Sequence, residues 1–361
     1  MSNRKQIQFK QLTVIAGTWI VAGVLIALYD HLVLMTASPK GAAASYSLLF
    51  SICFSAGSGL LGALLGGSFL IFYINVKYQD KPYGYTILSV ISSFLLIVLL
   101  VSLIRGAITL PNISGKPLLH ADTLSLLPSF LLDATRAKNI LVWLSIVSIT
   151  QLLLQFSNKF GQGAFAHIIR GKYNTPQREE KIFLFLDLNS STQIAEQLGD
   201  EKYHALLKDF FADITNPILD NKGEIYQYVG DEVVISWDYQ VGIFDNRCIR
   251  TFFDIKKCIH DNQDKYLKRY GLVPDFKGGV HSGKVIAGEV GTIKREVTYS
   301  GDVLNTTSRI LSMCRQLGAE ILTSASLSNA LTLDKQYVAH SLGAIKLKGK
   351  EKEIVLNAIS A

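Results

Sequence analysis

Four long stretches without a charged residue lie in the first half of the chain. No Lys, Arg, Asp or Glu occurs in residues 11–29, 41–76, 82–104 or 139–158. A helix needs about 20 mostly apolar residues to cross about 30 Å of hydrocarbon, and each stretch is close to that length or longer. We therefore expect transmembrane helices near residues 11–32, 46–75, 84–107 and 138–157. The alternative, buried helices of a soluble protein, is disfavoured by a mean hydropathy of +0.27 over the whole chain.

The basic residues between these stretches predict their orientation. Lys and Arg precede the first stretch, fill the connection between the second and third, and follow the fourth, whereas the first connection carries only Lys40. The third connection weakens this contrast because it also contains basic residues. The positive-inside rule predicts a multi-pass protein of the cell inner (plasma) membrane with both termini in the cytoplasm. The first stretch lacks a clear cleavage site followed by a polar region, so we do not interpret it as a cleaved signal peptide.

The charge of the chain also differs between its halves. Residues 1–180 carry 14 Lys and Arg against 6 Asp and Glu, and residues 181–361 carry 22 against 23. The positive excess therefore flanks the apolar stretches, where the anionic lipid bilayer is the natural partner. No stripe of basic and aromatic residues indicates nucleic-acid binding. The four cysteines lack metal-ligand spacing, and reduced thiols are expected for the three in the cytoplasmic half.

These observations predict a four-helix transmembrane domain over 1–157, a linker over 158–180 and a second, more polar domain over 181–361. In the linker, Phe160, Phe165 and Ile168–Ile169 would allow a short amphipathic helix at the membrane surface, which Gly171 and Pro176 would end. The linker is then either a passive tether or an element that couples the membrane domain to the second domain.

The second half alternates between strand and helix patterns. We expect a hairpin of strands 224–229 and 232–237, together with the strands 182–188, 276–281, 284–290 and 295–299 and the helices 191–198, 201–220, 246–269 and 302–315. Strands interleaved with helices around a central hairpin predict an α+β domain of the split βαβ, ferredoxin-like kind.

Two aspartates and a later Asn/Arg pair indicate the chemistry of this domain. Asp187 follows an apolar strand, and Asp231 lies at the turn of the predicted hairpin. Carboxylates brought together at adjacent strand ends form a hard oxygen site suited to Mg²⁺ or Mn²⁺. Asn305 and Arg309 lie one helical turn apart and can donate hydrogen bonds to charge developing on phosphorus. The pattern predicts metal-assisted attack on a nucleoside triphosphate; the alternative is a helix cap, a turn residue and a solvated helix.

Four ordered motifs carry a resemblance to a known family. They are Phe185-Leu186-Asp187 with Thr192, Val229-Gly230-Asp231-Glu232, residues 279–288 and residues 301–309. The segment from about Lys181 to the end of the chain resembles the class III nucleotidyl cyclase catalytic domain, here in a bacterial membrane-bound form. The resemblance covers about half of the chain and implies conversion of ATP to 3′,5′-cyclic AMP and pyrophosphate.

The resemblance also implies roles for particular residues at the metal end of the site. Asp187 and Asp231, with the backbone carbonyl of Leu188, would bind two divalent ions, Mg²⁺ or Mn²⁺. One ion would lower the pKa of the ribose 3′-hydroxyl, and the other would bind the triphosphate. Thr192 lies in the first turn of the following helix, whose N–H groups would face the phosphates. Glu232 is interpreted as a hairpin residue and not as a third ligand.

The remaining roles belong to the second group of residues. By the resemblance, Asn305 would hold the ribose, Arg309 would stabilise the pentacoordinate phosphorus, and Lys348 would bind the triphosphate. A second cation could come from Lys294 or Arg295. In this family the metal aspartates and the Asn/Arg pair of one site belong to different protomers, which implies a head-to-tail homodimer.

Two positions that would read the base depart from the commonest family pattern. Gln227 stands where adenylate-forming relatives usually carry Lys, and Thr298 stands where they usually carry Asp. The Gln227 amide both donates and accepts hydrogen bonds, so it suits adenine or guanine. ATP is favoured because Thr is known at the second position in bacterial relatives that make cyclic AMP. A guanylate or pyrimidine nucleotide cyclase remains the alternative.

Two alternative functions of the second half were compared with its motifs: the first stays open, and the second is disfavoured. A membrane receptor with a degenerate, dimerising cyclase domain would explain Gln227 but not the complete metal and Asn/Arg motifs. A diguanylate cyclase is disfavoured because its signature turn differs at Val229 and Val233. His281 fits a structural role at a strand end. The ligand that the membrane domain senses is not indicated by its sequence.

Overall fold

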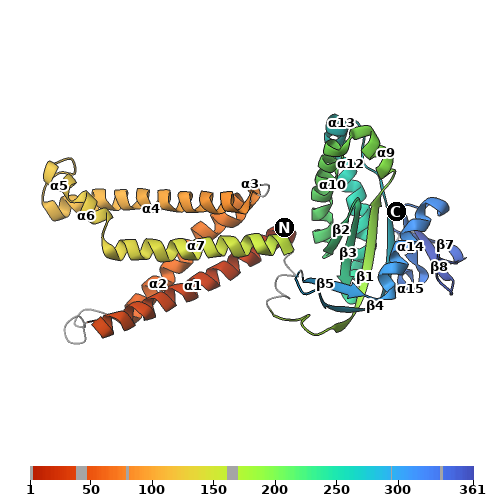
Figure 1. Ribbon diagram of the computed structural model, residues 1–361, viewed down its shortest axis with the longest axis horizontal. Helices are drawn as coiled ribbons and strands as arrows, with labels where there is room; N and C mark the ends of the chain where they lie inside the picture. The colour runs from red at the N-terminus through yellow and green to blue at the C-terminus, as the bar shows by residue number, and fades with distance from the viewer. Residues whose placement is uncertain (1–2, 38–46, 79–80, 161–169, 294, 334–335) are drawn as a thin grey trace. The chain divides into compact units, whose positions relative to one another are not determined.

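The computed structural model describes residues 3–37, 47–78, 81–160, 170–293, 295–333 and 336–361. The chain forms two compact units, one over Lys5–Phe160 and one made mainly of Gly161–Ala361 (Figure 1). Each unit has its own core, so we describe each by itself.

All the regular elements described in the first unit are helices. Its elements are α1 (Asn3–Ala37), α2 (Leu48–Gly62), the π-helical segments η2 (Ala63–Gly67) and η3 (Phe69–Ile74), α3 (Asn75–Lys77), α4 (Tyr83–Ser114), α5 (Ala121–Ser125), α6 (Leu127–Leu131) and α7 (Ala134–Phe160). Within the described part of the chain, four stretches are long and apolar enough to cross a membrane: Lys5–Thr36, Leu48–Lys77, Tyr83–Ser114 and Arg136–Lys159. The expectation of four membrane-capable helices is confirmed.

Small residues allow these helices to approach closely. A Cβ atom on Gly59 would lie 2.5 Å from the carbonyl oxygen of Trp19, and one on Gly23 would lie 2.5 Å from that of Ser55. Such contacts between backbones are a common basis of helix packing in membranes. Trp19 also donates a 2.9 Å hydrogen bond from Nε1 to Thr150 Oγ1, which joins α1 to α7.

The second unit is built on a mixed sheet. Its strands are β1 (Gln177–Leu188), β2 (Glu224–Val229), β3 (Glu232–Asp238), β4 (Phe276–Val290), β5 (Glu296–Ser300), β6 (Ile321–Ser324), β7 (Val338–Ile345) and β8 (Ile354–Ser360). They are ordered β2-β3-β1-β4-β6-β8-β7, and β5 pairs with β4. The fold class is the expected α+β arrangement, with β1 and β4 at the centre.

Helices cover both faces of this sheet (Figure 1). They are α9 (Ser191–Leu198), α10 (Asp200–Asp220), α11 (Tyr239–Ile243), the short 3₁₀ helix η4 (Phe244–Asn246), α12 (Arg247–Asp261), α13 (Gln263–Tyr270), α14 (Asp302–Leu317) and α15 (Ala325–Ser328). In β1, Leu184 belongs to the core beneath α10 and α12, and Phe183 belongs to the core beneath α14. Because both faces are covered, β1 is a continuous apolar run and not an alternating one.

Two expected divisions of the chain into elements differ from the structure. The helix expected over 246–269 is two helices, because Asn262 between them donates from Nδ2 to the Cys258 carbonyl, 2.8 Å away. The strands expected over 276–281 and 284–290 are one strand, because β1 pairs with β4 through Gly283 without a break. A Cβ atom there would lie 2.6 Å from Val303 Cγ2, so the glycine serves close packing of α14 and not a turn. His281 therefore lies inside β4, whereas the sequence predicted a position at a strand end.

The described residues just before β1 pack against strand β4. β1 begins at Gln177, so the last residues of the expected linker are strand. Phe165, Ile168 and Ile169 lie outside the described residues, so the expected amphipathic helix stays a prediction. Tyr173 is buried, and its carbonyl accepts a 3.2 Å hydrogen bond from the Glu289 N–H on β4.

Candidate active site

Strand pairing brings the two candidate metal-binding aspartates together. Asp187 lies near the end of β1 and faces Glu232 of β3 in the antiparallel register. Asp231 precedes Glu232 in the turn that joins β2 to β3, where Gly230 has a left-handed φ of 63° that suits a tight hairpin. Burial raises the pKa of Asp187, and the Asp231 carboxylate raises it further. The two carboxylates therefore lie close enough for their charges to interact, and this arrangement suits a hard cation.

Lys277 joins these carboxylates and was not selected from the sequence. It faces Asp187 across the β4–β1 pairing, and its Nζ lies 3.1 Å from Asp187 Oδ2. The ammonium group opposes the increase in the pKa of Asp187 that burial causes. The available signal was a single lysine inside the otherwise uncharged strand Phe276–Val280, where a buried charge requires a partner.

The donor set fits a divalent cation that prefers oxygen ligands. Among the described residues, no group of three or more His, Cys, Asp and Glu side chains has the geometry of a metal site. Two carboxylates with bound water and phosphate oxygens are nevertheless the usual environment of Mg²⁺ in phosphate chemistry. Burial, followed by the charges of Asp187 and Asp231, raises the pKa of Glu232 to about 7. A cation at this point would therefore relieve the repulsion among three neighbouring carboxyl groups.

The residues after Asp187 occupy the expected positions. Leu188 has a buried side chain, so only its backbone carbonyl is available as a ligand. Ser190 adopts a left-handed conformation with φ of 56°, and α9 starts at the next residue. Thr192 is exposed in the first turn of α9.

Arg309 lies on α14 against the turn between β7 and β8. A Cβ atom on Gly349 would lie 3.3 Å from Nη2 of Arg309, so a larger residue there would require the guanidinium to shift by a few tenths of an ångström. Lys348 is exposed on the same turn, and Lys350 forms an ion pair with Asp302 at the start of α14. Asn305 is exposed one turn before Arg309. The structure therefore brings the expected ribose- and phosphate-binding residues into one cluster.

Of the two residues that could supply a second cation, only Arg295 lies within the described part of the chain. Arg295 is 70% exposed and lies 3.9 Å from Glu289. Lys294 lies outside the described residues.

Each of the two candidate base-reading residues is the sequence neighbour of one tyrosine of a contacting pair. Gln227 follows Tyr226 on β2, and Thr298 precedes Tyr299 on β5. The Tyr299 N–H donates to the Tyr226 hydroxyl at 3.3 Å, and the two rings lie 4.9 Å apart. This contact joins β2 to β5. Gln227 and Thr298 are 71 positions apart in the sequence, but each is next to one of the two tyrosines.

The metal-binding residues and the phosphate-binding residues form separate clusters within one chain. In the part of the chain that the structure describes, no hydrogen bond or ion pair joins Asp187 or Asp231 to Asn305 or Arg309. The charges that act on Asp187 are those of Asp231 and Lys277, whereas Arg309 acts on Asp302.

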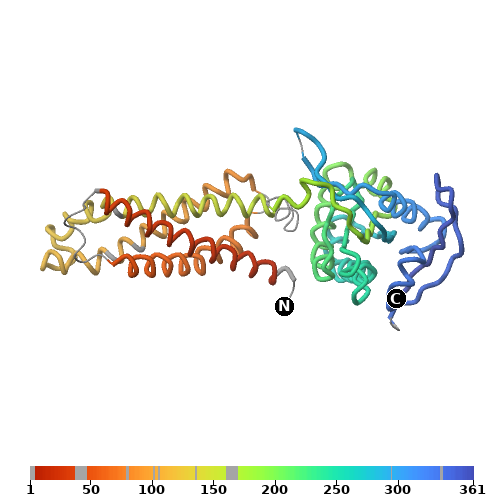
Figure 2. The backbone as a smooth tube through the Cα atoms, turned by 90° about the horizontal axis from the view of Figure 1, so that it is seen from below, coloured from red at the N-terminus to blue at the C-terminus, as the bar shows by residue number. Residues whose placement is uncertain are grey.

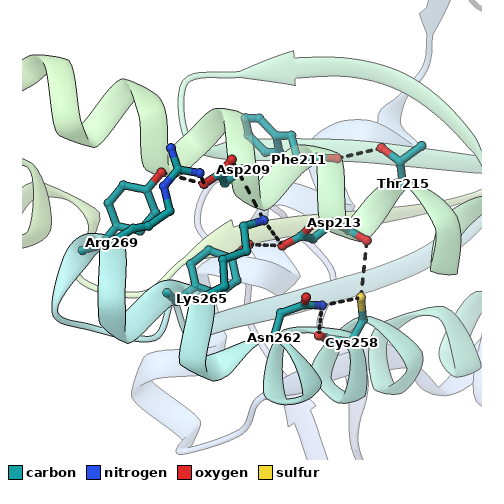
Figure 3. A network of polar contacts seen from close by, with 10 residues as sticks. Asp209, Phe211, Asp213, Thr215, Cys258, Asn262, Lys265 and Arg269 are labelled. Carbon is teal, nitrogen blue, oxygen red and sulfur yellow. Dashed lines mark hydrogen bonds and ion pairs between the residues drawn. The ribbon is translucent and has the colours of Figure 1, made fainter. Parts of the chain in front are cut away.

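A polar network holds α10 to α13 behind the β2–β3 hairpin (Figure 3). Lys265 Nζ lies 2.8 Å from Asp213 Oδ2, and Arg269 pairs with Asp209. α10 in turn contacts β2, because the Phe211 and Tyr228 rings lie 4.5 Å apart. The network therefore supports the hairpin that carries Asp231.

Comparisons with known proteins point to one family. The profile described as "Adenylate and Guanylate cyclase catalytic domain" matches residues 174–358. Adenylate cyclase 2 of Rhizobium meliloti is 36% identical over 209 residues, which cover 58% of this chain and 58% of that protein. The adenylate cyclase of Anabaena cylindrica is 26% identical over 188 residues, which cover 49% of this chain and 36% of that protein. The chain therefore matches less than two thirds of either relative.

A solved structure shares the fold of the second unit. A bacterial light-regulated adenylyl cyclase superimposes with a TM-score of 0.51 at 23% identity, over 60% of this chain and 64% of that one. At this level of identity the similarity concerns the fold alone.

Proposed function

Because the chain belongs to the adenylate and guanylate cyclase catalytic domain family, whose profile covers residues 174–358, we propose that it is a membrane-bound adenylate cyclase. It converts ATP to 3′,5′-cyclic AMP and pyrophosphate. The observation that carries this proposal is the direct interaction of Asp187 with Asp231 beside Lys277, matched by the cluster of Arg309 with the Gly349 turn. Thr298 and the adenylate cyclases among the relatives support ATP as the substrate.

Asp187, Asp231 and the Leu188 carbonyl would hold divalent cations, Mg²⁺ or Mn²⁺, at two per site. When bound, such ions supply a lowered pKa for the ribose 3′-hydroxyl and charge neutralisation on the triphosphate. Lys277 adds a fixed positive charge on the same side, where it would pair with a phosphate oxygen.

The other cluster would position the nucleotide and stabilise the transition state. Asn305 holds the ribose so that its 3′ oxygen faces the α-phosphorus in line with the leaving group. The new bond forms between that oxygen and the α-phosphorus, and the bond to the bridging oxygen of pyrophosphate breaks. Arg309 donates hydrogen bonds to the non-bridging oxygens as their charge increases, and Lys348 binds the departing pyrophosphate.

The active enzyme is proposed to be a head-to-tail homodimer. The separation of the two clusters within one chain supports this arrangement, because a complete site needs both. Each of two sites would then combine the aspartates of one protomer with Asn305, Arg309 and Lys348 of the other. A two-fold axis generates both sites at once, as in most homodimers.

The membrane unit would anchor the enzyme in the inner (plasma) membrane and regulate it. The four membrane-capable helices support a multi-pass protein, and the distribution of basic residues supports cytoplasmic termini. A catalytic unit that follows the last span would then meet ATP in the cytoplasm. Residues 158–180 would connect the transmembrane domain to the catalytic domain.

The substrate is tested by incubating the purified full-length protein in turn with ATP, GTP, CTP and UTP, each with Mn²⁺ and with Mg²⁺. Cyclic products are separated chromatographically, and a D187A/D231A double variant is the control for contaminating activity. Cyclic AMP from ATP is the expected product. Cyclic GMP or a cyclic pyrimidine nucleotide alone would contradict the choice of substrate but not the reaction. No cyclic product from any nucleotide would favour a receptor with a degenerate cyclase domain.

A further inference from the structure

A cavity lies between α4 and α7 in the membrane unit. These two helices run side by side in opposite directions (Figures 1 and 2). The cavity has a volume of about 300 Å³, and residues near one helical turn apart line it, among them Phe94, Val98 and Ser102 of α4 and Arg136, Asn139 and Trp143 of α7. This volume is at the lower end of the range for small-molecule sites.

The cavity contains a cation whose charge is not balanced by a described carboxylate. Arg136 Nη1 is buried and has no hydrogen-bond partner in the described structure. The guanidinium lies over the Phe130 ring, with Cζ 3.9 Å from the ring centroid. Lys138 offers a contrast, because its Nζ lies 2.7 Å from Asp30. Arg136 as a whole is half-buried, and it is the first residue of the fourth membrane-capable stretch. An unpaired polar atom of a cation at this position is unfavourable, and ionisable residues in membrane helices commonly mark a ligand site.

The lining residues give the cavity a polar end and an apolar end. Because α4 and α7 are antiparallel, Ser102 lies toward the level of Arg136 and Asn139, whereas Phe94 lies toward the level of Trp143. Among the lining residues, the hydrogen-bond donors Ser102, Arg136 and Asn139 therefore lie toward one end, and Phe94 and Trp143 lie toward the other. A ligand that matches both ends has an anionic head and a hydrocarbon chain.

We propose that this cavity binds an anionic amphiphile, with its carboxylate or phosphate paired to Arg136 and its chain between Phe94 and Trp143. The head group supplies the counter-charge that Arg136 lacks. Phe94 and Trp143 would contact the hydrocarbon chain of the ligand and bury part of it. A free fatty acid and an anionic phospholipid share this chemistry, and the experiment distinguishes them. The inference does not depend on the proposed catalytic activity.

Trp143 provides the readout, because bromine atoms on a neighbouring chain quench indole fluorescence. The full-length protein is placed in phosphatidylcholine nanodiscs and titrated with dibrominated stearate, dibrominated phosphatidylglycerol and the methyl ester of the stearate. A W143F variant subtracts the signal of the other tryptophans. Saturable quenching by either anionic probe is expected, with a half-saturation concentration at least about tenfold below that of the uncharged ester.

Variants of Arg136 test the role of the cation. R136Q should raise the half-saturation concentration of the anionic probe by about tenfold or more, whereas R136K should retain most of the binding. The matched control is K116Q. Lys116 carries the same charge and lies in the connection between α4 and α7, but it is exposed and pairs with Asp122. K116Q should bind like the unaltered protein.

The outcomes separate the possibilities. Quenching by the free acid alone identifies a fatty acid as the ligand, and quenching by the phospholipid alone identifies a membrane lipid. Equal binding of the ester and the acid to the unaltered protein would overturn the proposal without reliance on any variant. The same conclusion follows from R136Q binding like K116Q, or from the absence of saturable quenching.

Discussion

The ammonium of Lys277 lies 3.1 Å from Oδ2 of Asp187, on residues that face each other across the central strands β4 and β1. Lys277, Asp187 and Asp231 therefore lie at the same end of the neighbouring strands β4, β1 and β3. The lysine balances part of the negative charge of the carboxylates, and its remaining N–H donors can reach a phosphate oxygen. The pairing links the structure of the sheet to the binding of a metal–triphosphate complex.

Replacement of Lys277 by Ala should lower kcat/KM for the metal–ATP complex by about 10- to 100-fold, because a charge-assisted hydrogen bond is lost. Arg at this position should retain most of the activity. Steady-state kinetics with Mn²⁺ measures the effect. The control K284A removes a lysine that is exposed on the same strand. If K277A and K284A are equally active, Lys277 has no role in binding the substrate.

D187A and R309A should each be nearly inactive, and their mixture should recover activity. One variant lacks a metal ligand, and the other lacks a donor to the transition state. In a heterodimer, one site keeps all its parts and the other loses both. With random exchange of equal amounts, about a quarter of the wild-type activity should return, because half of the dimers have one working site. Co-assembly is checked with two affinity tags. Stable mixed dimers without activity would contradict the two-protomer site.

Gly349 and Gly343 allow a matched test of how Arg309 is positioned. Gly349 lies in the turn between β7 and β8, and Gly343 lies in β7 where its pairing with β8 is irregular. Their left-handed φ values are 70° and 81°, so Ala at either position introduces similar backbone strain. A Cβ atom on Gly349 would meet the Arg309 guanidinium, whereas nothing lies within 4 Å of one on Gly343. G349A should therefore lower kcat by about tenfold or more, and G343A should leave it near the wild-type value. Equal effects of the two substitutions on kcat would show that strain alone is responsible.

Stability should fall in mild acid because of His281. Burial, followed by the charge of Lys350, lowers the pKa of His281 to about 4. The unfolded chain takes up this proton below about pH 6.5, whereas the folded protein does so only near pH 4, so acid favours unfolding between these values. The contribution should reach about 2 kcal/mol at pH 5 relative to pH 7, since each pKa unit corresponds to about 1.4 kcal/mol.

The experiment compares urea unfolding of the full-length protein at pH 7 and pH 5, followed by the fluorescence of the buried Trp237. H281Q can still bond to Ser324, which lies 2.7 Å from His281 Nδ1, but it does not titrate. The difference between the two pH values should shrink by about 2 kcal/mol in H281Q. An unchanged difference would assign the acid sensitivity to other groups.

The segment before β1 should influence activity beyond tethering. Tyr173 is buried, and its hydroxyl donates to Glu179 Oε1 at 3.2 Å. Replacement of Gly171-Lys172-Tyr173-Asn174 by a Gly/Ser stretch of equal length removes these contacts. We expect altered basal activity, or an altered response to the lipid environment, with dimerisation retained. Y173F keeps the buried ring and should change activity less. Unchanged activity in both detergent and lipid would reduce the segment to a passive linker.

Local patterns in the chain were sufficient to predict the four membrane-capable helices, the central hairpin and the placing of Asn305 and Arg309 on one helix. A membrane helix satisfies its own backbone hydrogen bonds, so an uncharged stretch of sufficient length predicts it without knowledge of its neighbours. Asn305 and Arg309 share a face because helical periodicity places them there. Asp231 lies at a turn because Gly230 precedes it between two apolar strands.

Contacts between distant residues required the folded chain. Lys277 faces Asp187 only because β4 pairs with β1 in one particular register, and a shift of one residue would turn the side chain to the other face of the sheet. The sequence predicted separate strands over 276–281 and 284–290, but the pairing with β1 continues through Gly283, and Val303 of α14 packs into the space that its missing Cβ leaves. Gly349 likewise lies against Arg309 because α14 packs beside the β7–β8 turn. Strand register and packing depend on residues far apart in the chain, so local periodicity does not specify them.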